Sequence, residues 1–146
     1  MLMNTGIKTM FVIYFLVIAA LIFTDVSILN QAADNAKRTL DRAIDGGIIY
    51  GTIEEDYIKG RIRLDEDKVR KGINDLFRKN LNLDSSLSSE TYQRGKLIVT
   101  ITYHNGAPSV EAEYVAAIKM VAGKLVGLET QDIDIKKRTP YLSDYK

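Results

Sequence analysis

The stretch that decides the fold is FLVIAALIFTDVSILNQAADNAKRTLDRAIDGG, Phe15–Gly47. It begins as uncharged apolar residues and ends as a charged, alanine-rich segment, with no proline or glycine before Gly46. The absence of a helix breaker predicts one continuous helix, from about residue 7 to residue 45. Gly46-Gly47 is the predicted C-terminal stop, and continuation through Ile48–Tyr50 after a kink is the alternative.

The apolar part of this helix extends back to Thr9 and gives an uncharged run over residues 9–24. At a rise of ~1.5 Å per residue the run is roughly 24 Å long, against a hydrocarbon core of about 30 Å. The Lys8 side chain can reach the lipid surface at one end. We therefore predict an N-terminal stub over residues 1–8 and a transmembrane helix over residues 9–24. The predicted membrane-anchor residues are Met10, Phe11, Val12, Ile13, Tyr14, Phe15, Leu16, Val17, Ile18, Leu21, Ile22 and Phe23.

Two other interpretations of the apolar run stay open. A cleaved secretory signal needs a basic start and a small-x-small cleavage site, and the stretch LIFTDVS, Leu21–Ser27, contains no convincing one. A buried core helix is the other interpretation. Phe11–Ile18 is apolar on every face of a helix, and a chain of 146 residues has little protein to cover it.

Beyond Asp25 the helix changes character. Apolar or small residues recur at alternating spacings of four and three, and charged residues occupy the other faces. This period predicts an amphipathic helix over residues 25–47 that continues the span. Its stripe is expected to pack on the protein's own head or, through its small residues, against helices of neighbouring subunits, and both contacts can occur along different parts of one helix. The stripe residues are Leu29, Ala33, Ala36, Leu40, Ala43 and Gly47.

Residues 48–146 are expected to form an α+β head. A second helix is predicted over Leu64–Leu81, with Asp65 as its N-cap, and a serine-rich loop follows over residues 82–95. Asn105-Gly106 predicts a hairpin turn between strands. The segment 119–129 is either a loop or an apolar flap over the sheet. The predicted strands of the antiparallel meander are Lys96–Tyr103, Ser109–Ile118 and Thr130–Thr139, the last being an edge strand, with the amphipathic helix as their cover.

The composition narrows the possible functions. The net charge of +1 offers no surplus of basic residues for nucleic acid. No cysteine and a single histidine, His104, make a zinc or thiolate site improbable. The acidic clusters at residues 54–56 and 65–67 lack calcium-loop spacing and are expected to be solvated or helix-capping. We expect no enzyme activity, no cofactor, no metal and no small-molecule substrate.

The layout as a whole resembles that of type IV pilin-like proteins. The stretch NQAADNAKRTLDRAIDGG, residues 30–47, is most similar to the alanine-rich helix that follows the span in tight-adherence (TadE-like) pseudopilins. Prepilin peptidase substrates have Gly before the cleavage point and Glu five residues after it. Here Gly6 is followed by IKTMF, so that Phe11 stands where the Glu would be. Processing after Gly6 is therefore not supported by that motif.

The resemblance implies a structural subunit of an envelope pilus or secretion apparatus. Such a subunit is a single-pass protein of the cytoplasmic membrane that assembles through its N-terminal helix with other pilin-like subunits or with itself. We expect the short N-terminal stub inside the cell and the head outside. The alternative is a stand-alone, membrane-tethered, extracytoplasmic binding module.

Overall fold

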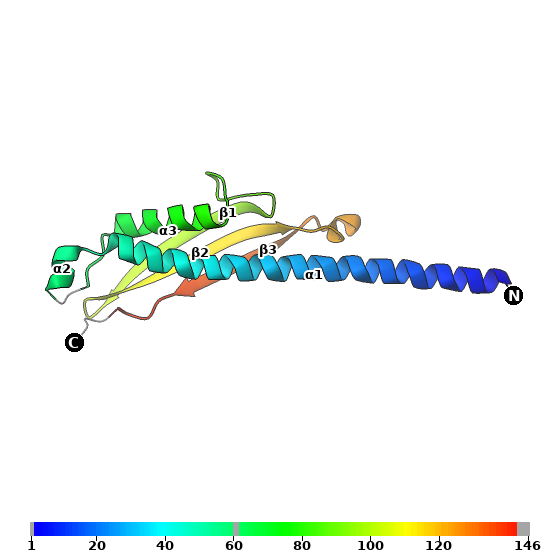
Figure 1. The fold of residues 1–146 in the computed structure, drawn as a ribbon, viewed down its shortest axis with the longest axis horizontal. Helices are drawn as coiled ribbons and strands as arrows, with labels where there is room; N and C mark the ends of the chain where they lie inside the picture. Colours follow the sequence, from blue (N-terminus) through cyan, green and yellow to red (C-terminus); the bar gives the residue numbers. More distant parts are fainter. Residues whose placement is uncertain (1, 60–61, 143–146) are drawn as a thin grey trace.

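The computed structural model describes residues 2–59 and 62–142. It confirms the α+β class: one long helix, further helices and a three-stranded antiparallel sheet. Figure 1 shows the long helix as a rod whose N-terminal half projects alone and whose C-terminal half carries the head. The elements follow in the order α1 (Leu2–Gly51), α2 (Glu54–Ile58), α3 (Glu66–Asn80), β1 (Tyr92–His104), β2 (Ala107–Lys119), the 3₁₀ helix η1 (Gly123–Val126) and β3 (Thr130–Arg138).

Helix α1 does not stop at Gly46-Gly47, so the predicted end of the helix is wrong. These glycines lie where α3 crosses α1. A Cβ atom on Gly47 would lie 2.4 Å from Cγ1 of Ile73, and one on Gly51 would lie 2.2 Å from Cγ2 of Val69. Close packing against α3 keeps the segment helical and outweighs the intrinsic preference of glycine for a helix end.

The sheet is the predicted meander, in the order β1-β2-β3. Asn105 and Gly106 have φ angles of 51° and 80°, as a tight two-residue turn between right-twisted strands requires. In the middle of the sheet Leu97 pairs with Tyr114, which pairs in turn with Ile135. Strand β3 lies at an edge, as the sequence predicts.

Strand β1 begins earlier than its sequence indicates. The register shifts between Gln93 and Lys96, and Arg94 has a φ angle of 54°, so the strand bulges here. Tyr92, before the bulge, is buried and donates its hydroxyl to the carbonyl of Ala32 in α1, at 2.7 Å. This contact between distant parts of the chain draws residues 92–95, expected as loop, into the strand.

The core lies between the sheet and the two long helices. The ring of Phe77 in α3 meets the ring of Tyr114 edge-on, with centroids 4.6 Å apart, and the ring of Tyr92 also meets Tyr114 edge-on, at 6.1 Å. The C-terminal half of α1 covers the sheet, as predicted. Fully buried core residues include Ala36, Leu40, Ala43, Val69, Ile73, Phe77, Val110, Ala112, Tyr114 and Ile118.

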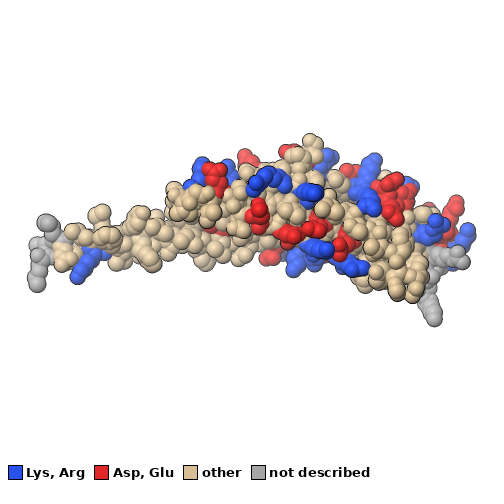
Figure 2. Space-filling model, turned by 180° about the vertical axis from the view of Figure 1, so that it is seen from behind, with Lys and Arg blue, Asp and Glu red and all other residues tan. Residues whose placement is uncertain are grey.

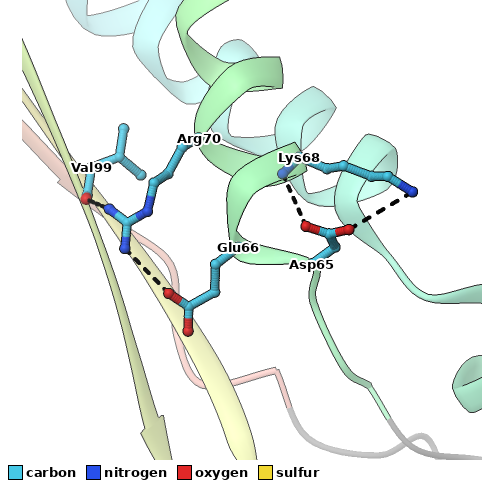
Figure 3. Close-up of polar contacts among 5 residues, drawn as sticks. All are labelled: Asp65, Glu66, Lys68, Arg70 and Val99. Carbon is cyan, nitrogen blue, oxygen red and sulfur yellow. Dashed lines mark hydrogen bonds and ion pairs between the residues drawn. The ribbon is translucent and has the colours of Figure 1, made fainter.

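Helix α3 begins as predicted. The Asp65 carboxylate accepts the backbone N–H of Lys68 at 3.2 Å and therefore caps the helix, as Figure 3 shows. One turn on, Arg70 bridges Glu66, at 3.2 Å, and the backbone carbonyl of Val99 in β1. The start of α3 is thus connected to the first strand of the sheet.

Candidate functional site

The N-terminal half of α1 is apolar and uncovered. The eight residues from Met10 to Val17 are each between 52 and 74 % exposed, and they point to every side of the helix. Ile18, Ile22 and Phe23 are also exposed, and Leu21 is half-buried. Figure 2 shows a largely uncharged stalk and charged side chains gathered over the head. By length and composition α1 is able to cross a membrane once.

The stripe on the C-terminal half of α1 faces the protein's own head. Ala36, Leu40 and Ala43 have no exposed surface, and Leu29 and Ala33 pack partly against the core. Gly47 is buried against α3. Four of the six stripe residues therefore offer no surface to a neighbouring subunit in this fold. The stripe is also wider than the sequence indicates, because Ala32 and Ile44 are buried beside it.

Asp25 is a buried, hydrogen-bonded residue that the sequence did not single out. It lies directly after the apolar run and is only 5 % exposed. Its carboxylate accepts the backbone N–H groups of Val121, at 2.6 Å, and of Gly123, at 2.7 Å. These bonds satisfy the charge and join α1 to the connection between β2 and β3. The signal in the sequence was the single acid at the end of an apolar run, but its partners are almost a hundred residues away.

The connection between β2 and β3, residues 120–129, is the loop held by Asp25. We call it the β2–β3 loop. It is closed by backbone bonds from Met120 to Glu129 and from Leu128 to Gly123, both 2.8 Å. In Figure 1 it is the orange segment at the end of the head nearest the free half of α1.

Of the two alternatives left open by the sequence, the structure shows a loop and not a flap over the sheet. Leu125 and Val126 are each 76 % exposed and Leu128 is 65 % exposed, so their side chains cover nothing. The bonds to Asp25 turn the loop toward α1 instead of the sheet.

A second candidate lies at the C-terminal end of α3. An open, polar depression there is lined by Asp75, Arg78, Lys79, Asn82, Leu83, Asp84 and Ser85. The Asp84 carboxylate is occupied by the hydroxyl and N–H of Ser86 and the N–H of Ser88, and these hydrogen bonds hold the pKa of Asp84 below its usual value. The carboxylate thus shapes the serine-rich loop.

The remaining candidate residues from the sequence make contacts within the fold. His104 is exposed at the hairpin, with its ring 5.5 Å from that of Tyr141. Asp65 is the α3 cap, and Asp56 forms an ion pair with Arg63 at 3.6 Å. Within residues 2–59 and 62–142 no cluster of three metal-ligating side chains occurs.

The candidate functional site is therefore the uncovered half of α1 together with Asp25 and the β2–β3 loop at its base. Comparison of the chain with family models, curated proteins and solved structures gives no match.

Proposed function

We propose that the protein is a membrane-anchored, pilin-like structural subunit of a cell-envelope assembly. The N-terminal half of α1 lies in the cytoplasmic membrane as a single span, and the head lies outside the cell. Subunits assemble through the span, and the head is the part displayed to solvent. Neither a cofactor nor a catalytic role belongs to this proposal.

One observation carries the proposal: a helix apolar on all sides projects from a folded head without a break. Met10–Val17 are more than half exposed all round, whereas the head covers one face of the same helix from Ile28 onward. Such a surface is unfavourable in water because apolar area costs about 25 cal/mol per Å² of exposure. Lipid, or the equivalent helices of other subunits, removes that cost. Because the stripe is buried in the head, the span is the apolar part of α1 that is available for assembly.

The test is disulfide crosslinking along the span. The chain has no cysteine, so single cysteines can be placed one at a time at residues 11–17 of the full-length protein in membranes. We expect oxidation to give crosslinked species at positions three or four residues apart, which lie on one helix face. Asn105→Cys, at the exposed hairpin tip, is the control and should give far fewer crosslinks.

The other outcomes are distinct. A membrane-bound protein that forms no crosslink at any span position supports the stand-alone tethered module instead. Protein recovered from the medium without the residues before Asp25 identifies the apolar run as a cleaved signal. Intact mass separates these two cases and also reports any processing after Gly6.

A further inference from the structure

The β2–β3 loop presents an apolar surface that the fold leaves uncovered. Val121, Leu125, Val126 and Leu128 are all more than half exposed within a stretch of eight residues. Clustered exposed apolar residues on a folded protein mark a contact surface. The loop is also ordered by its own backbone bonds, so these side chains are displayed from a defined base.

The position of the loop along α1 identifies what it contacts. Lys8 and Asp25 are separated by ~25 Å at the usual rise per residue. A hydrocarbon core of about 30 Å that begins near Lys8 therefore ends just beyond Asp25, close to Ile28. Because Asp25 binds the loop directly, the exposed apolar side chains lie at the same height as the lipid boundary.

The hydrogen bonds of Asp25 fit this position. A carboxylate near the edge of the hydrocarbon loses water and needs protein donors in its place. The N–H groups of Val121 and Gly123 supply them. Lys119, the last residue of β2, and Lys124 on the loop are both exposed, and their long side chains can extend to lipid headgroups while the apolar residues lie deeper.

We infer that the β2–β3 loop, held to α1 by Asp25, inserts its apolar side chains into the lipid boundary and seats the head on the membrane. This inference rests on the proposed function in so far as α1 must span the bilayer. It adds a second membrane contact, made by the head.

The experiment measures the depth of three labelled positions in one membrane. Leu125→Cys, Val17→Cys and Asn105→Cys are made separately in the full-length protein, labelled with an environment-sensitive fluorophore and reconstituted into phosphatidylcholine vesicles. Nitroxide lipids then quench the label from the headgroup level or from deep in the acyl chains. We expect the label at residue 125 to be quenched most by the shallow nitroxide, that at residue 17 by the deep one, and that at residue 105 by neither.

Quenching at residue 17 but not at residue 125 would overturn the inference and leave the anchor intact. Absence of quenching at residue 17 would overturn the anchor, and this inference with it. Asp25→Ala tests the hydrogen bonds: we expect loss of shallow quenching at residue 125 with residue 17 unchanged. Asp34→Ala, on an exposed part of α1, is the matched control and should retain both signals. Unchanged quenching at residue 125 in Asp25→Ala would show that Asp25 does not seat the loop.

Discussion

At the scale of single residues, glycines set how closely α1 and α3 approach. A Cβ atom on Gly72 of α3 would lie 3.1 Å from the Cα of Gly47 in α1, and Gly47 in turn has no room beside Ile73. The two helices therefore meet backbone to backbone. The same glycines that suggest a helix end from the sequence are the reason that α1 continues.

Gly47→Leu should destabilise the head by ~1–3 kcal/mol, because the added side chain forces the two helices apart. The measurement is chemical unfolding of the full chain in detergent, followed by the near-ultraviolet signal of its tyrosines. Gly6→Ala is the control: nothing lies within 4 Å of a Cβ there, so unfolding of the head should not change. Equal midpoints for the two variants would contradict the close crossing.

Tyr92 provides a second test at this scale. Its buried hydroxyl donates to the Ala32 carbonyl at 2.7 Å. Tyr92→Phe should lower the free energy of unfolding by about 1 kcal/mol, the usual net value of such a bond. Tyr103→Phe changes an exposed tyrosine of the same strand and should have little effect. An equally small effect at both positions would show that the hydrogen bond between Tyr92 and Ala32 does not stabilise the head.

At the scale of elements, the amphipathic half of α1 is a core helix of the head. Ala36 has no exposed surface, so Ala36→Glu places an unpaired charge in the core. We expect a loss of ~3 kcal/mol or more, enough to unfold a small head. Lys37→Glu, on the neighbouring exposed position, should leave the fold intact. Circular dichroism of the two variants distinguishes them, and a folded Ala36→Glu head would mean that the stripe faces outward.

Elements governed by local sequence were predictable. The Asp65 cap of α3 and the Asn105-Gly106 turn depend on residues that are neighbours in the chain. The strands were predictable because apolar and polar residues alternate along them. What the sequence did not reveal depends on distant contacts. The end of α1 is determined by α3, the start of β1 by Tyr92 against α1, and the place of the β2–β3 loop by Asp25. Each of these contacts joins residues that are far apart in the chain.

At the scale of the whole molecule, the head and the span share one helix but not one core. The earliest residue that packs on the core is Ile28. Removal of residues 1–24 should therefore leave a folded, water-soluble head that keeps the hydrogen bonds of Asp25. Removal of residues 1–36 also deletes the buried Ala32 and Ala36 and should unfold it. Size-exclusion chromatography and thermal melting of the two fragments check this, and an unfolded first fragment would mean that the span supports the head.

Because α1 is a single helix of 50 residues, a membrane around its N-terminal half would be mechanically coupled to the head. The helix is ~75 Å long, so a tilt of about 20° from the bilayer normal displaces its C-terminal end sideways by roughly 25 Å. A change in bilayer thickness alters the tilt of a helix that spans it. Because α1 is continuous, that change in tilt would reorient the head. A hinge between the apolar run and Ile28, where the head begins to pack on α1, would absorb this motion. The continuous helix transmits it.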